Sequence, residues 1–162
     1  MTEEERNILL LWANNMRIKY QIKKENPLIH ISENNSIPLV YEIKKRIELK
    51  ENIRIKKEQL TMGKEASDFL SFIDKDNFIM KHQDQNSEIT NTYQIRFNVI
   101  LSSPKNSCRT YYADKVVDIQ ERTYVMCKSG IDPHWTDINL DDKSRISLSF
   151  CYFLYKNEIK NL

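Results

Sequence analysis

Two cysteines at the outer ends of a segment that alternates like a β-hairpin are the first residues whose type and spacing indicate chemistry. Opposed residues of an antiparallel hairpin have a constant sum of residue numbers, and a register that opposes Cys108 to Cys127 centres the turn on Val117 and Asp118. Cysteines opposed at a non-hydrogen-bonded pair have Cα atoms about 4.5 Å apart, at the short end of the disulfide range. This spacing is compatible with a structural disulfide, which would stabilise the fold by roughly 3 kcal/mol, and equally with two cysteines that face each other without a bond.

The same register gathers arginine and tyrosine side chains on the other face of the hairpin. Alternation along residues 93–101 leaves a further arginine facing outward, on the sheet face that helices do not cover. Cross-strand Arg and Tyr side chains often stack for stability, and such a face can also bind a ligand. The candidate binding face consists of Arg96, Arg109, Tyr111, Arg122 and Tyr124.

Three histidines, His30, His82 and His134, lie far apart in the sequence. Together with a cysteine they could form a zinc site or a thiolate–imidazole pair, but no C-x-x-C or H-x-x-x-H spacing occurs. Cys127 and His134 are the best available nucleophile and base, although no glycine-lined backbone accompanies them. The sequence therefore predicts no metal ligand, no catalytic residue and no cofactor.

A basic segment at residues 40–60 is the remaining candidate site. Four glutamates alternate with its cations and no stacking aromatic side chains are interleaved, a pattern typical of a solvent-exposed helix face. Its alternative interpretation is a nucleic-acid-binding helix. The cations concerned are Lys44, Lys45, Arg46, Arg54, Lys56 and Lys57.

The elements that must position these residues change character along the chain. Thr2 and Glu5 match a capping box, and helical periodicity then predicts a helix over residues 3–24. A second helix is expected to run to about residue 60, with Val40 and Ile43 on its apolar face, and a third short helix over residues 61–73. Strict alternation predicts strands at residues 93–101, 108–116, 119–127 and 146–154.

Helices followed by strands indicate an α+β fold, with two or three N-terminal helices packed on an antiparallel sheet of four or five strands. We expect one domain over residues 1–162, helical at 1–75 and antiparallel β at 76–162. By analogy of fold order alone, the arrangement is similar to cystatin-like or NTF2-like proteins of bacterial secretion systems.

Composition excludes several functions. Of the 162 residues only two are glycine, so no glycine-rich phosphate-binding loop exists, and turns must rely on Asn, Asp and Ser. The net charge of +2 is too small to indicate nucleic-acid binding by itself. The longest apolar run, at residues 8–13, is too short to span a membrane, and no targeting segment is visible.

A stretch of about 45 residues resembles the surface-antigen domain of small bacterial outer-membrane lipoproteins. The residues that carry the resemblance are Thr92-Tyr93-Gln94, Cys108-Arg109-Thr110-Tyr111, Tyr124-Val125-Met126-Cys127 and Trp135. The resemblance implies a non-catalytic β-domain of the cell envelope. It also gives the cysteine bridge a precedent, and with it we predict a structural disulfide between Cys108 and Cys127.

These observations together predict a non-catalytic binding or assembly domain, associated with the bacterial cell envelope or a secretion system, whose partner is another protein. The competing interpretation is a cytosolic adaptor or nucleic-acid-binding protein that uses the helix at residues 40–60; an enzyme comes third. The expected location is the periplasm or envelope if Cys108 and Cys127 are bridged and the chain is a trimmed piece of an exported protein, and the cytoplasm otherwise.

Overall fold

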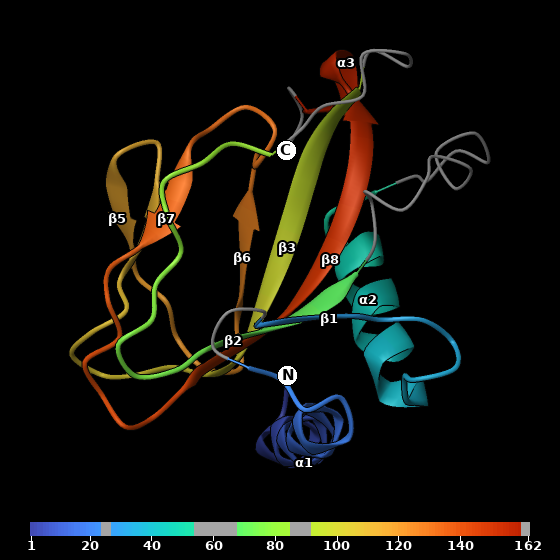
Figure 1. Ribbon diagram of the computed structural model, residues 1–162. Helices are drawn as coiled ribbons and strands as arrows, with labels where there is room; N and C mark the ends of the chain where they lie inside the picture. The colour runs from blue at the N-terminus through green and yellow to red at the C-terminus, as the bar shows by residue number, and fades with distance from the viewer. Residues whose placement is uncertain (24–26, 54–67, 85–91, 160–162) are drawn as a thin grey trace.

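The computed structural model describes residues 1–23, 27–53, 68–84 and 92–159, and it has the α+β fold expected from the sequence. Two helices pack on a five-stranded antiparallel sheet, and a three-stranded antiparallel sheet lies on its other side (Figure 1). The elements in chain order are α1 (Glu3–Lys19), β1 (Leu28–His30), α2 (Pro38–Lys50), β2 (Phe69–Ile73), β3 (Thr92–Ser102), β4 (Thr110–Tyr112), β5 (Lys115–Val117), β6 (Tyr124–Cys127), β7 (His134–Thr136), β8 (Arg145–Tyr155) and α3 (Lys156–Ile159).

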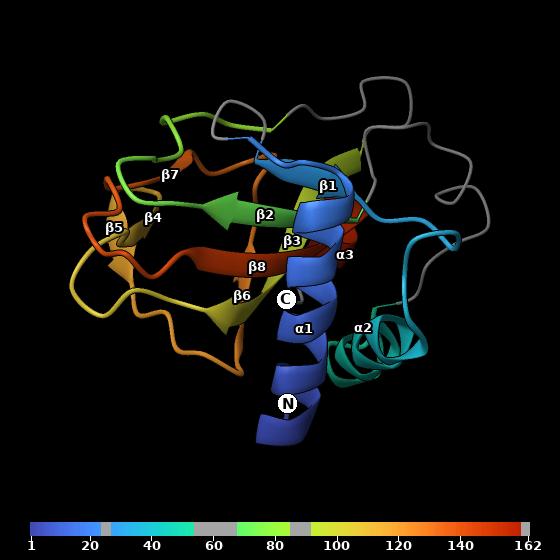
Figure 2. The same ribbon diagram turned by 60° about the horizontal axis from the view of Figure 1, so that its bottom comes forward.

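The larger sheet has the strand order β1-β2-β8-β3-β6, so the two strands of 11 residues, β3 and β8, form its centre. Both are among the strands predicted from alternation. Figure 2 shows β1, β2 and β8 side by side. Strand alternation divides β8 between two environments. Its apolar positions, from Ile146 to Leu154, belong to the main core, whereas Arg145, Ser147 and Ser149 face the smaller sheet.

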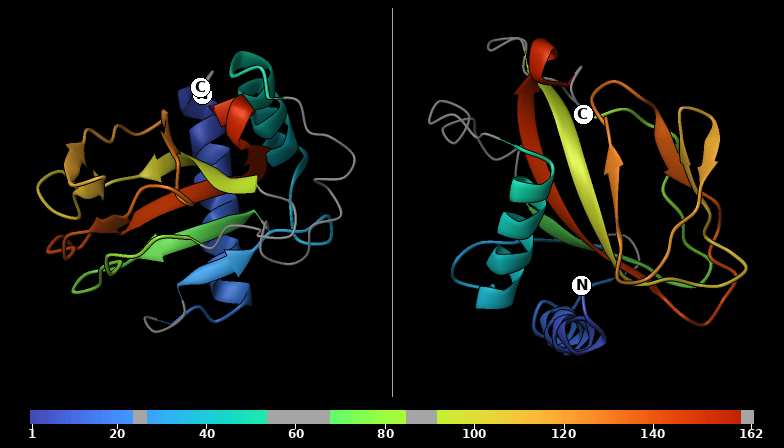
Figure 3. Two further views of the ribbon diagram at one scale, coloured as in Figure 1. Left: turned by 90° about the horizontal axis from the view of Figure 1, so that it is seen from above. Right: turned by 180° about the vertical axis from the view of Figure 1, so that it is seen from behind.

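Helices α1 and α2 cover the apolar face of the larger sheet (Figure 3). The predicted capping box is present at the start of α1, where Thr2 accepts from the amide of Glu5 and the Glu5 carboxylate accepts from the amide of Thr2. Tyr152 of β8 donates a hydrogen bond of 3.0 Å to Glu48 of α2. None of the described helices has the length and apolar character needed to cross a membrane.

The smaller sheet has the order β5-β4-β7, and it corrects the predicted hairpin. Strand β4 turns into β5 through Ala113 and Asp114, both with positive φ, as a two-residue hairpin turn of the primed type requires. Thr110 consequently opposes Val117 rather than Val125. The predicted register was wrong because this tight turn contains no glycine, the residue by which such a turn is usually recognised in a sequence. Strand β6 pairs with β3 in the larger sheet instead.

Helix boundaries differ from the prediction in two places. Helix α1 ends at Lys19, and Gln21 beyond it has a positive φ of 47°. Residues 69–73 form β2 rather than part of a third helix, because Leu70 pairs with Leu148 of β8. A short apolar run fits either period, and tertiary pairing decides between them. The predicted extension of the second helix over residues 54–60 lies outside the described residues.

Candidate metal centre

Two histidines that are distant in the sequence meet where residues 80–84 run beside β7. His82 and His134 form an antiparallel β-bridge, with backbone hydrogen bonds of 3.1 and 2.8 Å. The two imidazole rings have centroids 4.2 Å apart. Asp84 follows His82 by two residues, and in an extended backbone positions i and i+2 point to the same side. The bridge thereby assembles His82, Asp84 and His134 into one cluster.

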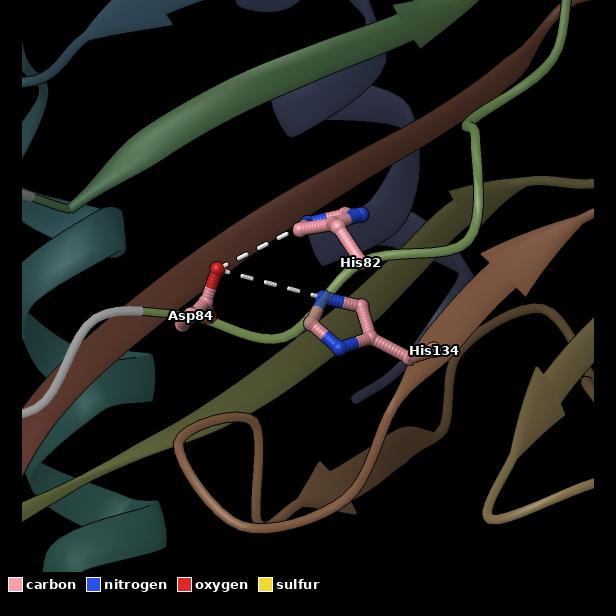
Figure 4. Close-up of side chains that lie close together, drawn as sticks. All are labelled: His82, Asp84 and His134. Atoms are coloured by element: carbon pink, nitrogen blue, oxygen red, sulfur yellow. Dashed lines mark ion pairs between the residues drawn. The ribbon is translucent and has the colours of Figure 1, made fainter.

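The three side chains converge on a common space (Figure 4). Asp84 Oδ1 lies 3.6 Å from Nε2 of His82 and 4.0 Å from Nε2 of His134. One donor atom from each residue lies within 4.8 Å of the others. His134 and Asp84 are largely shielded from solvent, with 13% and 9% of their side chains exposed, whereas His82 is 45% exposed.

Backbone carbonyls orient both imidazoles. Nδ1 of His82 lies 2.8 Å from the carbonyl oxygen of Met80, and Nδ1 of His134 lies 3.4 Å from that of Asp132. Because a carbonyl only accepts, each Nδ1 carries the proton and donates it. The neutral ring then presents the lone pair of Nε2, the state in which histidine binds a metal.

Asp84 is held as a carboxylate. Burial raises its pKa, but hydrogen bonds from His82, Arg96 and the Ser129 hydroxyl, together with the charge of Arg96, outweigh this and hold the pKa of Asp84 well below its usual range. Arg96 Nε donates to Asp84 Oδ2 at 2.5 Å, on the opposite side of the carboxylate from the histidines. An anionic oxygen, Oδ1, therefore faces both Nε2 atoms.

The two histidines differ in proton affinity. The hydrogen bond to Asp84 raises the pKa of His82, whereas burial, reinforced by the charge of His82, lowers the pKa of His134. The cluster thus combines an anionic oxygen with two imidazoles of different proton affinity.

The cluster borders a cavity of about 510 Å³ between the two sheets. Part of its lining is apolar and includes Phe69 and Ile73 of β2, the cross-strand neighbours of Ser149 and Arg145. The polar wall carries hydroxyl, amide and guanidinium groups from β3, β4, β7 and β8. These polar residues are Arg96, Asn98, Thr110, Tyr112, Thr136, Arg145, Ser147 and Ser149.

Arg145, the first residue of β8, is the most unusual group in the cavity wall. It is 4% exposed, and its guanidinium donates to the Thr110 hydroxyl. Its Nε has no hydrogen-bond partner, and among the described residues no carboxylate pairs with it. An unpaired buried cation is costly, so this arrangement favours an anionic ligand. A carboxylate is the group that a guanidinium binds best, through two parallel hydrogen bonds.

The donor set fits a divalent metal ion. Two imidazole nitrogens and one carboxylate oxygen are the ligands of the facial triad that binds non-haem iron(II) and leaves other coordination positions open. Neighbouring donors that contact one ion at about 2.0–2.2 Å lie roughly 2.8–3.6 Å from each other. The Nε2–Oδ1 distance of 3.6 Å to His82 is at the upper end of this range, and the distance of 4.0 Å to His134 is slightly longer, so a small approach of His134 would complete the site.

The predicted disulfide is absent. Cys108 and Cys127 are both free and buried, as is Cys151. Cys127 lies in β6 opposite Arg96 of β3, whereas Cys108 precedes β4, whose partners are β5 and β7. Burial raises the pKa of the Cys127 thiol to about 12, so it is not an activated nucleophile for His134.

The five residues of the predicted binding face do not form one surface in the structure. Arg96 lies in the cavity wall, while Tyr111 stacks on Trp135 with parallel rings whose centroids are 4.8 Å apart. Arg109 pairs with Asp137, Arg122 with Glu3, and Tyr124 donates to Glu51 at the end of α2. Only Arg96 of these five side chains lines the cavity.

The basic helix uses several of its cations within the fold. Lys44 forms an ion pair of 2.6 Å with Asp68, and Arg46 one of 2.8 Å with Glu5 of α1. Lys45 is exposed. The remaining cations of this prediction, Arg54, Lys56 and Lys57, lie outside the described residues.

The cluster was not predicted from the sequence because its three ligands follow neither the C-x-x-C nor the H-x-x-x-H spacing of zinc sites. The available signal was the triplet His82-Gln83-Asp84, which places two ligand types on one side of an extended segment. Neither His134 nor Arg145 has a local pattern that distinguishes it, because each is brought to the cavity by strand pairing. The assembly of the site is therefore a tertiary property.

The fold is similar to that of several solved hydroxylases and oxygenases. The alignment with a Pseudomonas putida prolyl-4-hydroxylase covers 96% of this chain and 89% of the hydroxylase chain, with 12% sequence identity and a TM-score of 0.65. The viral collagen prolyl hydroxylase of Paramecium bursaria Chlorella virus-1, solved with 2-oxoglutarate (2OG), matches 95% over 92%, with 11% identity and a TM-score of 0.63. HygX from Streptomyces hygroscopicus, solved with nickel and 2-oxoglutarate, matches 94% over 78%, with 12% identity and a TM-score of 0.63. No protein-family model matches the chain, and no curated protein is significantly similar to it in sequence.

These neighbours correct the functional expectation. They contradict the predicted non-catalytic binding or assembly domain of the cell envelope or a secretion system, and equally the alternative of a nucleic-acid-binding adaptor. The expectation that the chain is not an enzyme is wrong for the same reason. It was wrong because the ligand cluster and the cavity arise only from the pairing of distant strands.

Proposed function

We propose that this protein is a non-haem iron(II) oxygenase that uses 2-oxoglutarate as co-substrate. The observation that carries the proposal is the convergence of His82, Asp84 and His134 on one point at the wall of a cavity. Two imidazoles and one carboxylate are the ligands typical of such iron sites. The similar fold of enzymes solved with 2-oxoglutarate supports the same reaction class.

Arg145 supports the choice of co-substrate. 2-Oxoglutarate is a dicarboxylate, and its far carboxylate would satisfy the buried guanidinium, whose Nε has no partner. Thr110, which already accepts from Arg145, would complete the polar end of the cavity. The chain's own residues thus bind and orient the co-substrate at one end, with the metal ligands bordering the same cavity.

Bound iron(II) would supply dioxygen activation, with one oxygen atom entering the substrate as a hydroxyl and the other entering succinate as 2-oxoglutarate loses CO2. The residues of the chain hold the reactants and restrict water. His82, Asp84 and His134 would hold the ion, and three protein ligands would leave coordination positions open for other ligands. Phe69 and Ile73 of β2, which neighbour Ser149 and Arg145 across the strand pair, lower the local polarity and so strengthen the electrostatic contacts of the polar groups.

Metal binding is the first test. Titration calorimetry of the metal-free protein with Mn(II) or Ni(II) should give one ion per chain, and His134→Ala or Asp84→Ala should abolish this binding. His30→Ala is the matched control, because His30 lines the same cavity but does not belong to the cluster. Absence of metal binding by the wild-type protein, or its equal loss in the His30 variant, would overturn the proposal.

Co-substrate binding is the second test. Arg145→Met should weaken 2-oxoglutarate binding to the Mn(II)-loaded protein roughly 10- to 100-fold, the effect of losing charged hydrogen bonds worth about 1.5–3 kcal/mol, while leaving metal stoichiometry unchanged. Arg109→Met is the control, since Arg109 is an exposed arginine that pairs with Asp137. Wild-type protein loaded with Fe(II) should also form succinate from 2-oxoglutarate in air. Equal affinity of the wild type and the Arg145 variant would contradict the assigned binding mode.

A further inference from the structure

Arg96 of β3 contacts the carboxylate of the candidate metal centre from outside the ligand cluster. Its Nε lies 2.5 Å from Asp84 Oδ2, and both side chains are largely buried, with 15% and 9% exposed. The other oxygen of the same carboxylate, Oδ1, is the one that faces His82 and His134. Arg96 therefore donates a hydrogen bond to Oδ2, the carboxylate oxygen that could otherwise bind the metal as well.

The guanidinium of Arg96 is itself fixed from two further sides. Its Nη1 lies 3.0 Å from the sulfur of Cys151 in β8, the residue paired with it across the sheet. Its Cζ lies 4.6 Å from the ring centroid of Phe69 in β2. Contacts with β8 and β2 thus help to fix, from β3, the guanidinium that donates to the ligand carboxylate. A side chain placed this rigidly can transmit its orientation to the carboxylate.

We propose that Arg96 is a positioning residue, which holds Asp84 so that only Oδ1 is offered to the metal and the other coordination positions stay open for co-substrate and dioxygen. This inference depends on the proposed function, since it assigns a role within the same metal centre. Groups that orient metal ligands typically contribute 10- to 100-fold to metal affinity. Arg96 does so although it is a cation beside a cation site.

The positive charge of Arg96 and its hydrogen bond to Asp84 have opposite effects on metal affinity, so the two roles can be told apart. If Arg96 acted only through its charge, its removal would relieve repulsion and tighten binding of a divalent cation. If it positions Asp84, its removal frees the carboxylate and weakens binding. Metal affinity separates the two effects without any measurement of catalysis.

The experiment compares Arg96→Met and Arg96→Lys with the wild-type protein by calorimetric titration of the metal-free forms with Ni(II) and Mn(II). The methionine variant should bind 10- to 100-fold more weakly. The lysine variant, which keeps the charge and can donate one hydrogen bond to Oδ2, should bind with intermediate affinity. It also serves as the second variant if the methionine variant does not fold. Equal or tighter metal binding by the folded variants would overturn the inference.

Arg17→Met is the matched control. Arg17 pairs with Asp74 at 2.5 Å and lies over the ring of Phe72 at 5.5 Å, so it repeats the contacts of Arg96 at a place that contains no metal ligand. It should leave metal affinity unchanged even if it lowers the melting temperature. If the wild-type protein binds metal and only the Arg96 role fails, the proposed function survives. If the wild-type protein binds none, both fail.

Discussion

At the scale of single residues, the protein surrounds one anionic carboxylate with basic groups at the end of an extended segment. Asp84 faces two imidazoles through one oxygen and a guanidinium through the other. The backbone contributes the remaining precision, because the carbonyls of Met80 and Asp132 accept from the histidine Nδ1 atoms. The cluster is thus oriented before any metal binds, which reduces the free-energy cost of binding.

The cysteines give a prediction at this scale. All three are free and buried, and burial raises the pKa of Cys127 and of Cys151 to about 12. Because the thiolate is the reactive form, iodoacetamide at neutral pH should label the native, unreduced protein very slowly. In guanidinium chloride without reductant, mass spectrometry should show all three thiols labelled. Two cysteines that stay unlabelled under those denaturing conditions would indicate a bridge and contradict the structure.

Glu121 gives a pH-dependent prediction. Partial burial raises its pKa. The opposing effects of Lys143, the Ser103 amide and Arg6 are larger in sum, so the net pKa lies below the ordinary value of 4.5. A carboxyl with a depressed native pKa contributes stability above its unfolded pKa, and this stability is lost as the pH falls through the native value. Glu121→Gln should therefore destabilise the protein by about 1–2 kcal/mol at pH 7.

Urea unfolding at several pH values measures this effect. The difference between the wild type and Glu121→Gln should shrink progressively as the pH falls below about 4.5, because the wild-type carboxyl then becomes protonated as well. Asp118, an exposed acid close by in the sequence, provides the control through Asp118→Asn, which should change stability little. A difference that is constant across the range would show that the glutamate charge contributes nothing.

At the scale of elements, each helix and strand is defined by local signals, and its partners by contacts elsewhere. The capping box of α1 is a local signal that the structure confirms. Glu5 has a second role, since it also pairs with Arg46 of α2 at 2.8 Å. One residue of the first helical turn thus both begins α1 and joins it to the neighbouring helix.

Thr2→Ala tests the cap. The substitution removes the hydroxyl that accepts from the amide of Glu5, and loss of such a cap typically costs about 1 kcal/mol. We expect a decrease of that size in the free energy of unfolding, measured by urea denaturation. Thr2→Ser retains the hydroxyl and should restore most of the stability. An alanine variant as stable as the wild type would mean that the cap is not formed in solution.

At the scale of the whole molecule, the site lies where the two sheets face each other. The larger sheet contributes Arg96 and Arg145, and the smaller sheet contributes His134 and Thr110. The segment with His82 and Asp84 connects the sheets, through the bridge to β7 on one side and the ion pair with β3 on the other. A metal ion bound there would link both layers, so its binding should stabilise the entire fold.

Thermal unfolding checks this link. A ligand that binds only the native state at 100 times its dissociation constant adds about 2.7 kcal/mol of stability. Mn(II) at such an excess should raise the melting temperature of the wild type and of His30→Ala by several degrees, and EDTA should reverse the increase. His134→Ala should melt at the same temperature with and without Mn(II). An equal increase in that variant would place the stabilising metal elsewhere.

The local architecture of this protein follows from its amino-acid sequence alone. Alternation marked β3 and β8, the capping box marked α1, and the order of these patterns indicated an α+β fold. Scarcity of glycine predicted turns made by Asn, Asp and Ser. Among the described residues Asn52, Asp76 and Asp114 have positive φ as expected, but so do Gln21, Cys108, Ala113 and Arg122. These features depend on interactions among neighbouring residues, which a sequence pattern records directly.

Which strands pair, and therefore which side chains meet, depends on tertiary packing. His82 joins His134 through a two-residue bridge, and Arg145 reaches the same cavity from the start of β8. The register that opposed Cys108 to Cys127 was as consistent with the alternation as the true one, because a period of two does not specify the partner strand. The sequence shows which side chains could act as ligands. The packing of the two sheets brings three of them into one site, because that packing lowers the free energy of the whole fold.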